Sequence, residues 1–298
     1  MTVEKTHQYR PGLFVVMSLG LTWFWWALAI TLGGADEKVE TYAFKTVTLA
    51  FSLIGLLAPT ITAVSLIVRS RDRSLIADFV DRIVNVRRIS PRYLIVTLLL
   101  PPAAMCLAIG LSLLAGESTD QFRLTVDTSQ VGKLVTMVVL TMILAPILEE
   151  MGWRGYGVDS FRARMGMLKG TLAFGVLLSV WHAPLTLIPG SYHYGLAQME
   201  SPIYLANFFI GAIPTTIIIN WLYYKHDRSI LATALVHTTL NASGVLLAAT
   251  PTTDLIATGV FTAIGLVIVV VDRRLFSEGP RTFIRQAAPE GGSRASGS

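Results

Sequence analysis

Residues 13–32 read LFVVMSLGLTWFWWALAITL, a run of 20 residues without a charged side chain. An α-helix needs about 20 apolar residues to cross the hydrocarbon core of a bilayer, so this run predicts a membrane-spanning helix. It follows Lys5 and Arg10, as the apolar part of a signal peptide would, but it is long and Trp-rich and has no small-residue cleavage site after it. We therefore expect it to be retained as the first span.

The same pattern recurs along the whole chain. Further uncharged runs lie at 46–68, 93–115, 170–190, 203–224 and 229–250, and shorter ones at 134–148 and 255–271. The 298 residues are 53% hydrophobic and only 14% charged, with a mean hydropathy of +0.59. This composition excludes a disordered chain, a fibrous repeat and an ordinary cytosolic enzyme. The predicted fold class is all-α, a polytopic membrane bundle of about eight transmembrane helices.

The basic residues predict the orientation of this bundle. If all eight runs cross and the N-terminus is cytoplasmic, the inside segments hold 20 of the 24 Lys and Arg residues. Only Lys38, Lys45, Arg123 and Lys133 then lie outside. By the positive-inside rule we expect both termini in the cytoplasm, in a cell membrane of the bacterial plasma-membrane type.

Charge and cysteine content exclude other classes of protein. The formal net charge of +5 comes from basic residues clustered between apolar runs, so it indicates topology and no nucleic-acid partner is expected. Cys106 is the single cysteine, which excludes an intramolecular disulfide framework and a Cys-based zinc site.

The domain organisation follows from the same runs. Residues 1–285 are predicted to form one transmembrane domain, and the Ala-, Gly- and Ser-rich residues 286–298 a disordered tail. The basic segment 69–92 is either an amphipathic helix at the membrane surface or a plain topology-setting loop. Apolar residues recur in it at roughly helical intervals, at Leu75, Ile76, Phe79, Ile83 and Val84.

Two adjacent carboxylates lie where the fourth span should end. The run 134–148 has 15 residues, which rise about 22 Å and are too few for a bilayer core of about 30 Å. To cross, the helix must include Lys133 or Glu149 and Glu150. Glu150 and Arg154 are four residues apart and can pair on one face, which leaves Glu149 to face a cavity. The alternative is an ordinary ion pair at a cytoplasmic helix end.

Two histidines fall inside other predicted spans. His182 lies in the fifth, and His237 and Asn241, four residues apart on one helical face, lie in the seventh. One intramembrane histidine is usually a packing or hydrogen-bonding residue. Two of them, together with a Glu-Glu pair, predict that Glu149, His182, His237 and Asn241 line one polar cavity, because leaving such groups in lipid is costly.

These residue types suit hydrolysis by an activated water. A carboxylate or a neutral histidine can take a proton from water, and preorganised donors can stabilise an oxyanion. No G-x-S-x-G sequence is present, and Cys106 has apolar neighbours, so covalent catalysis fits less well. Glu149, His182 and His237 are also a plausible zinc set, although H-E-x-x-H is absent. The residue types alone leave both chemistries open.

The motifs Glu149-Glu150-x-x-x-Arg154, Trp181-His182-x-Pro184 and His237-x-x-x-Asn241 resemble those of a known family. This is the CAAX-protease and bacteriocin-processing (CPBP, or Abi) family of intramembrane endopeptidases, which includes the type II CAAX prenyl proteases. The similarity covers residues 131–247, which would be the catalytic core. One departure is Leu178, where the family usually has Phe four residues before the histidine.

The resemblance implies a role for each residue of these motifs. Glu149 would activate water, His182 would help to position it, and His237 and Asn241 would stabilise the oxyanion. Glu150 and Arg154 would be supporting residues. The family has been described both as metalloproteases and as glutamate proteases without a metal, so zinc is compatible, although no cofactor is expected.

The resemblance implies an intramembrane endopeptidase. The position of Glu149 near the cytoplasmic end of its span predicts that the site opens to the cytoplasm, because the water used in hydrolysis must reach it. The partners of the endopeptidase would be the lipid bilayer and a peptide or protein substrate that is prenylated or membrane-bound. A proton- or cation-coupled secondary transporter that uses the same Glu and His residues is the alternative from another class. A transporter should show repeat symmetry or paired broken helices, and the sequence shows neither. A catalytically silent immunity or scaffold protein is a third reading.

Overall fold

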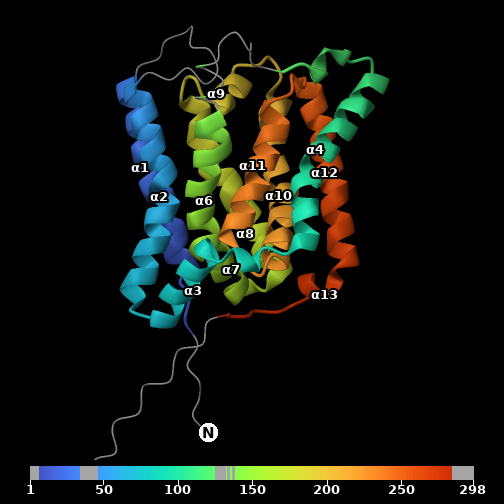
Figure 1. The fold of residues 1–298 in the computed structure, drawn as a ribbon. Coiled ribbons are helices and arrows are strands. Elements are labelled where there is room, and N and C mark those ends of the chain that lie inside the picture. Colours follow the sequence, from blue (N-terminus) through green and yellow to red (C-terminus); the bar gives the residue numbers. More distant parts are fainter. Residues whose placement is uncertain (1–6, 34–45, 125–131, 133–134, 136–137, 284–298) are drawn as a thin grey trace, which may run out of the picture.

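The computed structural model describes residues 7–33, 46–124, 132, 135 and 138–283, and this part of the chain is helical (Figure 1). Within it, six helices are long and apolar enough to cross a membrane. The helices in which these spans lie are α1 (Pro11–Gly33), α2 (Thr46–Ser70), α4 (Pro91–Leu114), α8 (Met167–His182), α10 (Pro202–Lys225) and α12 (Pro251–Val271). The predicted all-α polytopic membrane bundle is confirmed. The predicted tail 286–298 and Lys133 lie outside the described residues.

The fourth span gains its length by continuing past the two glutamates. A π-helical segment, η3 (Val138–Leu144), leads into α6 (Ala145–Gly152), a second π-helical turn, η4 (Trp153–Gly157), and α7 (Val158–Met165). Leu144, Trp153 and Val158, at the junctions, keep right-handed helical dihedrals, so the helix does not break. Glu149 and Glu150 therefore lie inside a helix and not at its end.

The seventh span is shorter than its uncharged run, and the eighth is longer. Helix α11 (Ile230–Val245) stops before residue 250 because the next helix begins there. The Thr250 side chain caps α12 by accepting a hydrogen bond from the backbone N–H of Thr253, and Pro251 takes the first helical position. Asp254 thus joins the first turn of α12.

The basic segment after α2 forms a helix, α3 (Arg73–Val84), capped by Asp72. Its buried residues include Leu75 and Phe79 on the apolar face, as the periodicity predicts. Its buried face also contains Arg82, whose guanidinium donates to the carbonyls of Arg154 at 2.6 Å and Gly155 at 2.9 Å. Of the two expectations for this segment, the helix is confirmed, and its apolar face covers the end of the bundle.

Close backbone packing places α6 beside α2. Gly152 lies so near Pro59 that a Cβ atom added to it would be 2.5 Å from the Pro59 carbonyl carbon. The Thr60 hydroxyl donates to the carbonyl of Leu148 across the same contact. Small residues at such contacts let membrane helices approach closely, and here the approach fixes the height and rotation of the carboxylate-bearing helix.

Both ends of the described chain lie at the same end of the bundle. Helices α3, α7 and α13 (Arg273–Phe276) gather there, whereas α9 (Tyr192–Ala197) lies at the opposite end (Figure 1). His7 contacts Asp72 at 3.2 Å, and the ring of Phe283 lies against Arg228. This arrangement agrees with an even number of crossings.

Candidate active site

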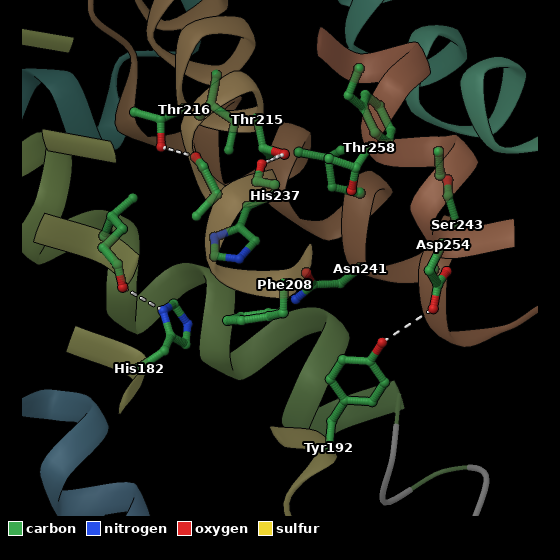
Figure 2. Close-up of a pocket in the computed structure, with 18 of the residues that line it drawn as sticks. His182, Tyr192, Phe208, Thr215, Thr216, His237, Asn241, Ser243, Asp254 and Thr258 are labelled. Atoms are coloured by element: carbon green, nitrogen blue, oxygen red, sulfur yellow. Dashed lines mark hydrogen bonds between the residues drawn. The ribbon is translucent and has the colours of Figure 1, made fainter. Parts of the chain in front are cut away.

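A cavity of about 300 Å³ lies among the helices, and the four residues predicted to share one cavity all line it. Glu149 comes from α6, His182 from α8, and His237 and Asn241 from α11. Figure 2 shows His182, His237 and Asn241 around this space. Helices far apart in the sequence therefore bring carboxylate, imidazole and amide groups to one place.

Glu150 connects two of the motifs. Its carboxylate oxygens lie 2.9 Å and 2.8 Å from one guanidinium nitrogen of Arg154, as the four-residue spacing predicts. The same carboxylate accepts from Nδ1 of His237 at 3.0 Å. Glu150 and Arg154 are 0% and 1% exposed. The alternative of an exposed helix-end ion pair is therefore wrong, since this pair is buried and shared with a third residue.

Glu149 points to the cavity and not to Arg154. Its side chain is buried, and one carboxylate oxygen lies 3.4 Å from the indole nitrogen of Trp153, one turn further along. A long hydrogen bond to a neutral donor leaves the carboxylate able to accept a proton. The structure thus has the arrangement predicted for the two glutamates: Glu150 is paired with Arg154, and Glu149 faces the cavity.

His182 is held through its backbone-facing nitrogen. Nδ1 donates to the carbonyl of Leu178 at 2.7 Å, and since a carbonyl only accepts, Nε2 of the neutral ring is the acceptor (Figure 2). The bond uses the main chain of Leu178, so the Leu in place of the family's usual Phe does not remove it.

Two buried polar residues at the site were not among the predicted ones. Asn220, on α10, accepts from Arg154 at 3.0 Å and donates to the hydroxyl of Thr171 at 3.2 Å. Trp153 supplies the hydrogen bond to Glu149. The sequence does hold a signal for Asn220, because it is an asparagine inside the uncharged run 203–224. Nothing in the sequence marks Trp153.

The rest of the cavity wall is largely apolar. Leu240 on α11, Ala257 and Phe261 on α12 and Met105 on α4 line it, and Gly244 leaves open space beside them. An apolar space next to polar reacting groups is the usual construction of a binding site for an amphipathic ligand.

The cavity reaches the end of the bundle that carries α9. Tyr192 on α9 and Asp254 at the start of α12 line it and hydrogen bond to each other at 3.3 Å (Figure 2). This end is opposite α3, α7 and α13, so from the positive-inside rule we expect it to face the outside of the cell. Two expectations from the sequence thus conflict. The termini lie at the other end of the bundle from this part of the cavity, so the termini and the opening of the site cannot both be cytoplasmic.

The donor set does not form a ready-made metal site. Within the described residues, no group of three or more His, Cys, Asp or Glu side chains is placed to hold a metal ion. Nδ1 of His237 is engaged by Glu150, and Nδ1 of His182 by a carbonyl. These two bonds leave Nε2 of each ring available, as is usual for metal-binding histidines, so the misfit to a preformed zinc site lies in how Glu149, His182 and His237 are placed relative to one another.

Comparisons with known proteins place these residues in a family context. A family model described as type II CAAX prenyl endopeptidase Rce1-like matches residues 131–243. This range includes every candidate residue named above, except Gly244 and the residues on α4 and α12. The CAAX prenyl protease 2 of Methanococcus maripaludis is 32% identical over 274 residues, which cover 92% of this chain and 98% of that protein.

Proposed function

The chain belongs to the Rce1-like type II CAAX prenyl endopeptidase family of intramembrane peptidases, and from this premise we propose that it cleaves a prenylated protein substrate with a water activated by Glu149. The observation that carries the proposal is the convergence of Glu149, His182, His237 and Asn241 on one cavity.

The first step is attack of water on the substrate carbonyl. The Glu149 carboxylate takes a proton from the water as its oxygen bonds to the carbonyl carbon. Nε2 of His182 accepts the other water hydrogen and so orients the attack. When the C–N bond breaks, the proton on Glu149 passes to the leaving amine nitrogen. Atoms and charge balance without a covalent enzyme intermediate.

Charge on the developing oxyanion is stabilised from α11. The amide of Asn241 is a donor that faces the cavity from the same helix as His237. Since Nδ1 of His237 donates to Glu150, its Nε2 donates only when the ring carries both protons, and the buried Glu150 carboxylate stabilises that positive charge. Glu150 thereby acts through His237, and Arg154 keeps Glu150 in place.

The apolar wall suits a lipidated substrate. A prenyl chain can lie against Leu240, Ala257 and Phe261 while the peptide bond beside the modified cysteine faces Glu149. Burying such a chain contributes about 25 cal/mol per Å² of apolar surface removed from water. The relative's name, CAAX prenyl protease 2, supports this substrate class for the present chain.

The test is cleavage in proteoliposomes by purified full-length protein. A farnesylated peptide that ends in a Cys-aliphatic-aliphatic-X sequence is the probe, and the released tripeptide is measured by mass spectrometry. We expect Glu149→Gln to lower kcat by about 10²–10⁴-fold while retaining substrate binding, because an amide cannot take the proton. Glu200→Gln is the matched control, since Glu200 is exposed and does not line the cavity.

Two further arms separate the competing readings. Cleavage should persist after treatment with a chelator. If the chelator abolishes activity and zinc restores it, a bound metal and not Glu149 alone activates the water. Full activity of Glu149→Gln, or uptake of a solute without peptide release, would overturn the proposal in favour of a transporter.

A further inference from the structure

His193 lies against the ring of His182, although its place in the sequence is a connection between two spans. It belongs to the short helix α9, outside the six candidate spans. The two imidazole rings are stacked with centroids 5.2 Å apart and planes inclined by 28°. His193 is not among the residues that line the cavity, so it meets the site through lining rings that it contacts, of which His182 is the catalytic one.

Other aromatic rings complete the enclosure of His182. Phe208, on α10, stands edge-on to both histidines, 4.3 Å from His193 and 5.3 Å from His182 between centroids. Trp181 contacts His182 at 4.6 Å with its plane nearly perpendicular. The His182 ring is therefore bounded by rings from α8, α9 and α10.

The ring of His193 is suited to stacking and not to carrying charge. Its Nε2 is buried and has no hydrogen-bond partner among the described residues. Burial holds the pKa of His193 well below its usual range, and the neighbouring His182 lowers it further, so the ring is neutral near pH 7. A neutral flat ring can pack on His182 without placing a second positive charge beside it.

The hydrogen bond from Nδ1 to Leu178 fixes only one point of the His182 ring. Rotation about the bond between Cβ and the ring has a broad, roughly two-fold preference, so another contact has to define the plane. We propose that His193 is a positioning residue that holds the plane of His182 so that Nε2 points at the attacking water. This inference rests on the proposed hydrolysis, because it assigns His193 a role through His182.

The proposal predicts a loss in turnover with little change in substrate binding. His193→Ala removes the stacked ring, and His193→Phe keeps a flat ring of similar size without nitrogen atoms. In the proteoliposome assay we expect His193→Ala to lower kcat by roughly 10- to 100-fold, since small misplacements of a catalytic group cost up to about that much. KM should stay within about twofold, and His193→Phe should restore most of kcat.

The matched control is Tyr194→Ala, which removes a ring from the neighbouring position of the same short helix and should behave as the wild type. Thermal unfolding in detergent checks that each variant is folded. Wild-type kcat in His193→Ala overturns the proposal. So does a His193→Phe variant as slow as His193→Ala, because the nitrogen and not the ring would then matter.

A spectroscopic arm keeps this inference separate from the proposed function. Nitrogen NMR of histidine-labelled protein should report one neutral tautomer for His182, protonated at Nδ1, in the wild type and in His193→Phe. We expect a broadened or mixed signal in His193→Ala. An unchanged His182 signal there overturns the inference, whereas a wild-type protein that fails to cleave the prenylated peptide counts against the proposed function only.

Discussion

At the scale of single residues, Glu150 explains how two of the three motifs act as one unit. Its carboxylate lies between the guanidinium of Arg154 and the imidazole of His237, all on helices buried in the bundle. Removing one partner of a buried ion pair typically costs about 3–5 kcal/mol, because the other charge is left unpaired away from water. Asn220 extends the network to α10, and thus ties Arg154 to a second helix.

Truncation of two asparagines near this network should affect two different properties, turnover at Asn241 and stability at Asn220. Asn241→Ala removes a donor that faces the cavity, so we expect kcat to fall by about 10²–10³-fold. Asn220→Ala removes the acceptor of one guanidinium nitrogen of Arg154 and the donor to the Thr171 hydroxyl, both buried, so we expect a stability loss of about 1–3 kcal/mol. Peptide-release kinetics and thermal unfolding of both variants check this. An Asn241→Ala variant with wild-type kcat would remove Asn241 from the mechanism.

At the scale of helices, the contact between α2 and α6 decides where Glu149 lies. A Cβ atom at Gly152 would approach the backbone nitrogen of Thr60 to 2.6 Å, and backbone cannot move aside as a flexible side chain would. We expect Gly152→Ala to destabilise the protein by about 1–3 kcal/mol and to lower activity by displacing Glu149.

Gly20→Ala is the control for this substitution. Gly20 lies in α1, and a Cβ atom added there would meet nothing within 4 Å. The change should be neutral or slightly stabilising, because alanine favours a helix over glycine by about 1 kcal/mol. Thermal unfolding in detergent measures both variants. Equal stability of Gly152→Ala and the wild type would contradict the close approach of α2 and α6.

A buried ion network joins α3 and α7 to the turn before α11. Asp159 lies 2.6 Å from the guanidinium of Arg228 and 3.4 Å from that of Arg82, and it accepts from the hydroxyl of Tyr223 at 3.0 Å. Burial alone would raise the pKa of Asp159, but Arg228 and Arg82 outweigh it and lower the pKa below the ordinary 3.8.

The lowered pKa of Asp159 determines how the stability of the protein depends on pH. A carboxylate with a depressed folded-state pKa contributes fully above its ordinary pKa, and its contribution is lost as the pH falls through the lower folded value. We therefore expect thermal stability to fall on acidification below about pH 4. Asp159→Asn should lose about 3–5 kcal/mol near pH 7 and show a smaller acid-dependent fall. Arg87→Ala, at an exposed position of the same basic segment, should leave both quantities unchanged. An acid-dependent fall in Asp159→Asn as large as in the wild type would show that other groups cause it.

At the scale of the whole molecule, one prediction concerns which end of the bundle faces the cytoplasm. It follows from the 20-to-4 division of the basic residues and from the position of the cavity. We expect the end with α3, α7 and α13 to be cytoplasmic, which makes the α9 end external and lets substrate enter from that half of the membrane. In a Cys106→Ser background, cysteine at Glu117 or Glu200 should react with a membrane-impermeant thiol reagent on intact cells. Cysteine at Arg71 should react only after permeabilisation. The reverse pattern would restore the cytoplasmic opening and contradict the charge rule.

The sequence by itself determined the fold class and the set of polar residues worth testing. Both follow from local physics: runs of apolar residues must be helical in a bilayer because every backbone group needs an internal partner, and ionisable groups inside such runs are too costly to occur by chance. The pairing of Glu150 with Arg154 is equally local, since it needs only a spacing of four residues on a helix.

Only the tertiary structure decided how these residues face one another. The bond between Glu150 and His237 joins residues 87 positions apart, and the stacking of His193 on His182 depends on where α9 folds back. The tertiary structure also added Asn220 and Trp153 to the site and showed that the cavity reaches the α9 end. Long-range packing sets these relations, and neither periodicity nor spacing along the chain contains the rotation and height at which one helix meets another.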